Sequence, residues 1–387
     1  MTIRARACGM TIRARACGMT VLARACGMTV LARACGMTLM ASAALHAQEV
    51  GGKGTLYVGT YAKKILVIDE ATMKTVDSIP VSIGIPYNMS LSYNRTHIYA
   101  NDPADEKVEV FDLATRKAVN SFSLSKDSLK VQIVSMNVDP KERFAVLLIR
   151  TTRRRPDRYE IGKPTLVRYD LAKKVVTDTI PWPLGQEREN AQIIFSPSGD
   201  LMYFFTSEDI LIYNSETLKQ VDKWDLGRSW DEGLGRFNFG FPNDVFEEPG
   251  FYTGLFRIQD PVNRRPMMGI ARVDLTKKSV DFYTLGPSDN VSFRLAPGRK
   301  RAYGLKSQVG LYEFWTFDLD SHRVLGKTEF KGRPRMSMTP SSNGRMLYIY
   351  TAGTTIDLYD SQTFKLDRTI HLNADQTRVL LVPPPAR

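Results

Sequence analysis

Seven segments of the chain repeat one pattern of apolar and polar positions. Each begins with an alternating apolar run, continues with Asp or Asn and a short polar turn, and ends in a second alternating run. A period of two residues predicts strands and not helices. The copies are ILVIDEATMKTV from Ile65, VEVFDLATRKAV from Val108, LVRYDLAKKVV from Leu166, ILIYNSETLKQV from Ile210, IARVDLTKKSV from Ile270, FWTFDLDSHRV from Phe314 and IDLYDSQTFKLD from Ile356.

The acidic or amide residue of each copy marks the repeat length. These markers are Asp69, Asp112, Asp170, Asn214, Asp274, Asp318 and Asp360, and their spacings are 43, 58, 44, 60, 44 and 42 residues. The shorter spacings match four short strands with tight turns, which is one propeller blade. A side-chain oxygen at the marker can accept from backbone N–H groups two residues on and hold the turn between the two outer strands. We therefore interpret the seven markers as structural and not as catalytic acids.

Ahead of most copies lies another pair of runs joined by a Pro, Asn or Gly turn, which predicts the two inner strands of each blade. The first blade offers only three strands, and the chain ends in an unpaired run, TRVLLVP, from Thr377. That run can pair beside Thr55–Gly59 and close the ring, which removes the exposed sheet edges. The sequence thus predicts an all-β fold, a seven-bladed β-propeller over residues 54–385 closed by its C-terminal strand.

Residues 1–47 are a repeated leader. A nine-residue unit recurs four times, and all four cysteines (Cys8, Cys17, Cys26 and Cys35) belong to it. We interpret it as a tandem duplication around a start codon, which leaves Met10, Met19, Met28 and Met37 as possible starts. The stretch from Met37 to Ala47 has the small and apolar character of a signal peptide, with a lipoprotein anchor on one cysteine as the alternative. Residues 48–53 are then a linker, and the exported chain cleaved after Ala47 contains no cysteine.

Charge changes the picture little. The chain has 387 residues and a formal charge of +12, but residues 1–47 carry six arginines and no acid. The remaining +6 is an ordinary surface balance, so we expect no nucleic-acid partner. No run of eighteen apolar residues occurs, so we expect no membrane span.

The two long spacings indicate a binding face. We place both sets of extra residues between the second and third strands of a blade, at 151–164 and within 247–269, where they emerge on one face with the connections between blades. Binding concentrates in long loops of rigid scaffolds, and Arg and aromatic residues are favoured at protein interfaces. The predicted partner-binding face comprises Arg153, Arg154, Arg155, Arg158, Tyr159, Trp182, Trp230, Phe239, Tyr252, Phe256, Arg264 and Arg265.

No self-contained catalytic pattern stands out. The four histidines, His46, His97, His322 and His371, are scattered without a second ligand at metal spacing. No haem-attachment, nucleophile-elbow, P-loop or dinucleotide motif occurs. We therefore predict neither catalytic nor metal-binding residues in this chain. A propeller lactonase remains an alternative, and it would draw its metal ligands from Asp102, Asn190, Asp244 and Asn290.

The repeats TLYVGT, SPSGDLMYFF and VFDLATRKAV resemble the YVTN class of propellers. More specifically, the chain resembles the β subunit of quinohemoprotein amine dehydrogenase over nearly all of residues 54–382. That resemblance lies in the basic insertion before GKPTLVRYDLAKKVV, in MMGIARVDLTKKSVDF and NVSFRLAPGRKRAYG, and in the closing IDLYDSQTFKLDRTIHL.

The resemblance implies a periplasmic heterotrimer that deaminates primary amines oxidatively. A dihaem cytochrome c subunit and a small subunit bearing cysteine tryptophylquinone would be the partners. Both cofactors would lie in those partners, and this chain would be a subunit with no cofactor and no catalytic residue of its own. The alternative from another class is a stand-alone exported YVTN propeller that binds a protein or a cell-surface partner.

Overall fold

The computed structural model describes residues 24–25, 28–29, 51–206, 209–225, 238–239, 248–260, 262–333 and 335–384. The chain divides into two compact units, Met1–Gln48 and Glu49–Arg387. In the first unit, β1 (Arg24–Ala25) pairs with β2 (Met28–Thr29) in antiparallel fashion. The four cysteines and the predicted signal-peptide stretch lie outside the described residues.

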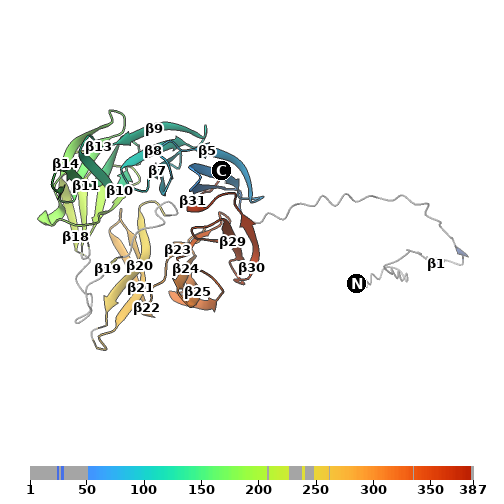
Figure 1. The fold of residues 1–387 in the computed structure, drawn as a ribbon. Coiled ribbons are helices and arrows are strands. Elements are labelled where there is room, and N and C mark those ends of the chain that lie inside the picture. The colour runs from blue at the N-terminus through green and yellow to red at the C-terminus, as the bar shows by residue number, and fades with distance from the viewer. Residues whose placement is uncertain are drawn as a thin grey trace. The chain divides into compact units, whose positions relative to one another are not determined.

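The second unit is a seven-bladed β-propeller, as predicted, with seven antiparallel sheets in a ring (Figure 1). Blade 1 contains β31 (Gln376–Val382), β3 (Thr55–Thr60), β4 (Lys64–Asp69) and β5 (Lys74–Pro80), from the inside outward. Blade 2 contains β6 (Asn88–Leu91), β7 (His97–Asn101), β8 (Lys107–Asp112) and β9 (Lys117–Ser123). Blade 3 contains β10 (Leu129–Val138), β11 (Phe144–Arg154), β13 (Thr165–Asp170) and β14 (Val175–Ile180), with the short β12 (Tyr159–Ile161) paired to β11.

The remaining blades follow the same order from the axis outward. Blade 4 contains β15 (Gln192–Phe195), β16 (Leu201–Phe205), β17 (Asp209–Asn214) and β18 (Gln220–Asp225), and a 3-10 turn, η1 (Pro183–Gly185), precedes it. Blade 5 contains β19 (Asn238–Phe239), β20 (Phe251–Gln259), β21 (Pro266–Asp274) and β22 (Ser279–Pro287). Blade 6 contains β23 (Arg294–Leu295), β24 (Arg301–Gln308), β25 (Leu311–Asp318) and β26 (Arg323–Glu329). Blade 7 contains β27 (Ser337–Pro340), β28 (Met346–Tyr350), β29 (Thr355–Asp360) and β30 (Leu366–His371).

The hydrophobic core lies between the blades. The described residues form seven buried apolar clusters, and each joins two neighbouring blades around the ring. The cluster between blades 1 and 7, for example, packs Leu56 and Ile68 against Tyr348 and Leu358. Each blade therefore buries its apolar residues only when both neighbours are in place.

The marker residues have the structural role that the sequence indicates. At Asp112, the Oδ1 atom accepts hydrogen bonds from the N and Oγ1 atoms of Thr115, both at 2.6 Å. At Asn214, the amide oxygen accepts from the backbone N of Glu216 at 3.1 Å and of Thr217 at 2.8 Å. The fourth residue after every marker has a positive φ, between 53° and 59°, in the left-handed region: Met73, Arg116, Lys174, Leu218, Lys278, His322 and Phe364. The turn between the outer strands thus has the same left-handed residue in all seven blades.

The C-terminal strand closes the ring as predicted. Strand β31 pairs antiparallel with β3, so that Leu56 faces Leu381 and Val58 faces Val379. A buried carboxylate strengthens the joint. Glu70 accepts hydrogen bonds from Gly54 N at 2.7 Å, from Ser342 N at 2.7 Å and Oγ at 2.5 Å, and from the Tyr348 hydroxyl at 2.9 Å. Burial and this carboxylate raise the pKa of Tyr348, so its hydroxyl remains a donor.

The segment predicted as a linker packs tightly where it is described. Gly51 and Gly52 are buried. A Cβ atom would lie 2.0 Å from the Tyr348 hydroxyl at Gly51, and 1.8 Å from the Ser342 Oγ at Gly52. Only glycine lets the backbone pass this close to blade 7.

The blade 5 insertion is not where the sequence analysis placed it. Strand β20 ends at Gln259 and β21 begins at Pro266, so the second and third strands are joined by six residues. The extra length falls between the end of β18 at Asp225 and the start of β20 at Phe251. The physical reason is that residues 256–259 and 266–269 pair with each other and lengthen both strands.

Removal of residues 376–387 should open the ring. We expect the free energy of unfolding to fall by on the order of 5 kcal/mol, since four apolar side chains of β31 leave the core at roughly 1–2 kcal/mol each. Chemical denaturation followed by circular dichroism measures the change. Removal of residues 385–387 alone is the control, because it leaves β31 complete. An unchanged unfolding midpoint in the longer deletion would contradict the closure.

The marker turns should make stability fall in acid. The backbone N–H of Lys173 lowers the pKa of Asp170, and hydrogen bonds from the following turn likewise lower the pKa of Asp112, Asp318 and Asp360. A lowered folded-state pKa stabilises the fold above the unfolded-state pKa, and this contribution is lost as the pH falls through the folded-state pKa.

Replacing those four aspartates by Asn should therefore flatten the fall of Tm between about pH 5 and pH 2.5. Asn keeps the acceptor oxygen, as Asn214 does in blade 4. The reverse variant, Asn214→Asp, should steepen the same curve. Parallel curves for all three proteins would show that these carboxylates do not account for the acid dependence.

Candidate functional site

The strand order separates two faces of the ring. We call loop face the side that carries the connections between blades and the loops between second and third strands, and turn face the opposite side. The described segments of the loop face are 61–63, 81–87, 102–106, 124–128, 155–164, 181–191, 206, 260, 262–265, 288–293, 309–310, 330–333, 335–336, 351–354 and 372–375.

The blade 3 insertion is a β-hairpin on the loop face. Strand β11 runs on to Arg154 and pairs with β12, so Thr152 faces Ile161 and Arg154 faces Tyr159. The predicted arginines 153, 154, 155 and 158 are all exposed, as is Tyr159. Tyr159 and Ile161 lie on one side of β12 and are 66% and 73% exposed. The hairpin thus combines basic side chains with uncovered apolar ones.

Ion pairs within the hairpin neutralise part of its positive charge. Arg155 Nε lies 2.9 Å from Glu160 Oε2, and Arg158 contacts Asp157 at 2.9 Å and Glu160 at 3.2 Å. These pairs are exposed and contribute little to stability. Arg153 and Arg154 form no ion pair with the described residues, so their charge faces solvent.

The blade 5 loop places Arg264 and Arg265 on the same face. Asp260 organises the loop by accepting from Val262 N at 3.0 Å and from the Asn263 side chain at 2.8 Å. Both arginines are exposed, and Val262 is 84% exposed.

Tyr252 and Phe256 do not belong to this face, and here the sequence analysis was wrong. Both are buried on β20, in the cluster between blades 4 and 5. The ring centroids of Tyr252 and Phe205 lie 5.1 Å apart, and those of Phe256 and Phe282 lie 5.4 Å apart in an edge-on arrangement. The physical reason is again that this segment is a strand, whose alternate side chains enter the core.

The predicted tryptophans differ in position. Trp182 is half-buried, and its Nε1 donates to the Pro164 carbonyl at 2.9 Å, which ties the connection before blade 4 to the base of the hairpin. Trp230 lies outside the described residues. For Phe239, the structure describes only the pairing of β19, which places it opposite Phe256.

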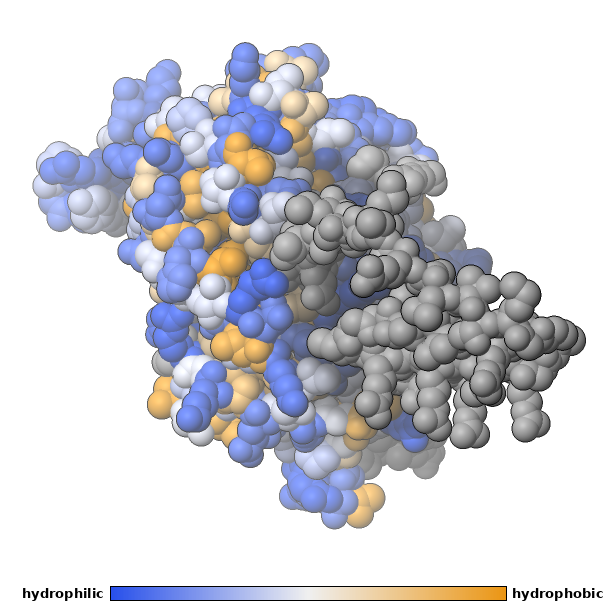
Figure 2. All heavy atoms as spheres, turned by 90° about the vertical axis from the view of Figure 1, so that its right-hand side faces the viewer, coloured by the Kyte–Doolittle hydropathy of each residue, from blue (hydrophilic) through white to orange (hydrophobic). Residues whose placement is uncertain are grey.

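The large exposed apolar side chains divide between two places in the described part of the propeller. Half of them lie on the outer strands around the perimeter: Val76, Val119, Val175, Val176, Val221, Leu325 and Leu366. The other half lie on the loop face: Tyr61, Tyr87, Tyr159, Ile161, Leu184, Val262 and Val309. None of these large side chains lies on the turn face among the described residues. On the side of the ring that Figure 2 shows, apolar residues form small spots separated by hydrophilic ones.

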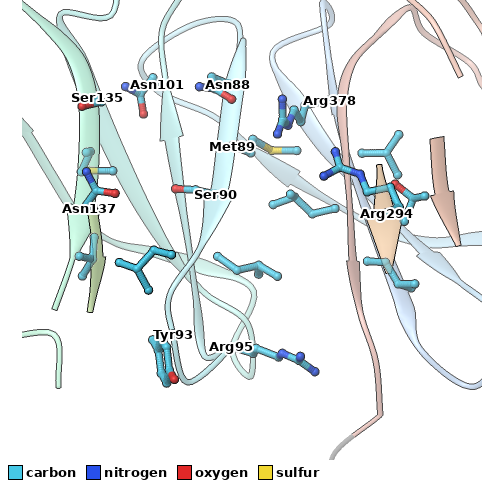
Figure 3. Close-up of a pocket in the computed structure, with 18 of the residues that line it drawn as sticks. Asn88, Met89, Ser90, Tyr93, Arg95, Asn101, Ser135, Asn137, Arg294 and Arg378 are labelled. Atoms are coloured by element: carbon cyan, nitrogen blue, oxygen red, sulfur yellow. The ribbon is translucent and has the colours of Figure 1, made fainter. Parts of the chain in front are cut away.

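The inner strands surround a central channel of about 700 Å³. Strands β6, β10, β15, β23, β27 and β31 supply its described wall. Figure 3 shows two tiers of polar side chains along it. Asn88, Ser135 and Arg378 form one tier, and Ser90, Asn137 and Arg294 form the other. The tiers follow from strand geometry, because side chains two residues apart point the same way.

The described channel wall contains one acid, Asp105. Burial raises the pKa of its carboxyl, and the neighbouring Asp102 adds to the rise, while a hydrogen bond from the Asn101 side chain opposes it. Of the residues that line this wall, the sequence pointed only to Asn190, as a metal ligand of the lactonase alternative. The signal that could have found them is the polar alternation on the first strand of each blade.

The lactonase alternative receives no support from the described positions. Asp102 accepts from the backbone N of Glu106 and Lys107, both at 2.8 Å, as a loop residue does. Asn290 N donates to Asp289, and Asp244 lies outside the described residues. Across the described part of the chain, no three His, Cys, Asp or Glu side chains are grouped to hold a metal ion.

Within the same residues, no helix combines the length and apolar character needed to cross a bilayer.

Comparison with known proteins shows the fold alone. No protein-family model matches the chain, and no curated protein does either. A functionally unknown protein from Desulfotomaculum acetoxidans DSM 771 aligns with a TM-score of 0.53 at 11% identity, over 86% of this chain and 100% of that one. Apo AztD from Citrobacter koseri aligns with a TM-score of 0.50 at 13% identity, over 85% and 98%. A eukaryotic initiation factor aligns with a TM-score of 0.50 at 9% identity, over 87% and 100%. The chain is thus a seven-bladed β-propeller similar to proteins of various functions.

Proposed function

We propose that this chain is a docking subunit without a catalytic centre of its own, and that the loop face binds its protein partner. The observation that carries the proposal is the asymmetry between the faces. Large exposed apolar side chains occur on the loop face and not on the described turn face, and the basic β11–β12 hairpin emerges on the loop face as well.

The chemistry of that face suits a protein. Tyr and Arg are the side chains that contribute most at protein interfaces, and a rim of polar groups normally surrounds them. Tyr159 and Ile161 are bracketed by Arg154 and Lys163, so an apolar centre with a basic edge is available. An acidic, partly apolar surface on the partner would complement it.

The sequence resemblance supplies the identity of the assembly. In a quinohemoprotein amine dehydrogenase of the periplasm, this chain would pack against a dihaem cytochrome c subunit and a small quinone-bearing subunit. The residues agree with that division of labour, because residues 48–387 contain no cysteine. Covalent haem and the thioether of cysteine tryptophylquinone both require cysteine, so both cofactors would belong to the partners.

Substitutions in the hairpin should weaken partner binding without unfolding the ring. We expect Arg153→Ser, Arg154→Ser, Tyr159→Ser and Ile161→Ser together to raise the Kd by about a hundredfold, which is the scale expected when interface hot spots are truncated. The tagged chain is recovered from its own host, and the accompanying chains are stained for haem and quinone and quantified.

The matched control is Val119→Ser with Val221→Ser. These two valines are also exposed apolar side chains, but they lie on outer strands away from the loop face. Loss of the haem-stained chain only with the hairpin variant supports the proposal. Equal recovery with all variants would exclude the hairpin as the interface, and a colourless monomer would favour a stand-alone propeller.

A further inference from the structure

The channel contains two arginines whose charge is not neutralised by the protein. The Nε atom of Arg294 donates to the Met338 carbonyl at 3.3 Å, and no carboxylate of the described residues pairs with this guanidinium. Arg378 is exposed to the channel and pairs with no described acid either. Elsewhere in the ring, by contrast, Arg116 and Arg143 contact Asp77 and Asp139 at 3.0 Å and 2.8 Å.

The backbone aims Arg378 into the channel. Its strand has an irregularity between the pairs formed by Val58 and Thr60, so two residues of β31 lie opposite Gly59. The hydroxyl of Thr377 donates to the Pro86 carbonyl at 2.6 Å. A Cβ at Gly59 would lie 2.6 Å from that Thr377 Oγ1 and 2.9 Å from the Pro86 oxygen, so glycine is needed for this approach. The Thr377 side chain is thereby held against Pro86, and the Arg378 side chain projects into the channel (Figure 3).

Neutral donors and acceptors line the wall beside the two guanidinium groups. Ser135 follows a bulge in β10, and its Oγ is buried without any hydrogen-bond partner. Leaving such a hydroxyl unpaired costs free energy, which a ligand oxygen can recover. Asn88 and Asn137 present amides that both donate and accept, in the same two tiers as the arginines (Figure 3).

We propose that the channel binds a small polyhydroxylated organic anion. Its carboxylate or phosphate group would bind Arg294 and Arg378, whose planar forks match either oxyanion. Its hydroxyl groups would hydrogen-bond Ser135, Asn88 and Asn137. The channel volume of about 700 Å³ lies within the range typical of small-molecule sites. This site is separate from the loop face and does not depend on the proposed docking function.

Calorimetric titration of the full chain at low ionic strength tests the site. The probes are gluconate, glucose 6-phosphate, glucose and inorganic phosphate. We expect one gluconate or glucose 6-phosphate per chain, and much weaker binding of glucose and of inorganic phosphate. The stronger of the two sugar anions identifies the oxyanion as a carboxylate or a phosphate, and both results support the proposal.

Variants then locate the binding. Arg294→Gln and Arg378→Gln should each weaken the Kd by about tenfold or more, as expected for loss of a charged hydrogen bond. Ser135→Ala should weaken it less. Arg323→Gln is the matched control, because Arg323 is an exposed arginine on the outer strand β26. Melting curves of all variants confirm folding.

Three results would overturn the proposal. The first is that no probe binds. The second is that glucose or inorganic phosphate binds as tightly as the sugar anions. The third is that folded Arg294→Gln and Arg378→Gln variants bind like the unchanged chain.

Discussion

The joint between blades 1 and 7 is the constraint on which the rest of the propeller depends. Strand β31 comes from the end of the chain and supplies the innermost strand of a blade whose other three strands come from its beginning. At the turn face, the buried Glu70 carboxylate accepts from Gly54, Ser342 and Tyr348 and so joins the same two blades. Breaking such a buried polar network costs far more than losing an exposed ion pair. Because every apolar cluster needs two neighbouring blades, an open joint would also expose the cluster around Leu56 and Tyr348.

A closed ring separates two kinds of binding surface. The loop face presents exposed apolar and basic side chains on surface loops. Such loops can carry these side chains without changing the packing of the core. The channel is narrow, and its inner strands hold polar side chains in two fixed tiers. The first geometry suits a protein and the second a small molecule. One scaffold can therefore present both kinds of surface.

Much of the fold could be predicted because its signals are local. Each marker turn depends on a side-chain acceptor at one position and a left-handed residue four positions later. Every blade therefore has a counterpart of Asp112 and a counterpart of Arg116. The closing strand was predictable because the first blade lacked one strand. The blade 5 insertion was misplaced because spacing counts residues without saying which of them pair. In FYTGLFRIQ, the alternation of Phe256 and Ile258 with Arg257 and Gln259 was the available signal for a strand.

The sequence by itself determined the seven repeats, the turn chemistry and the ring closure, because each is specified by residues close together in the chain or by the count of strands. It also indicated the basic hairpin at Arg153–Arg155, since extra length in a regular repeat must leave the sheet. Only the tertiary structure decided the channel. Asn88, Ser135, Arg294 and Arg378 come from four different blades, and no local pattern links them. They share one cavity because ring closure turns the first strand of every blade toward a common axis.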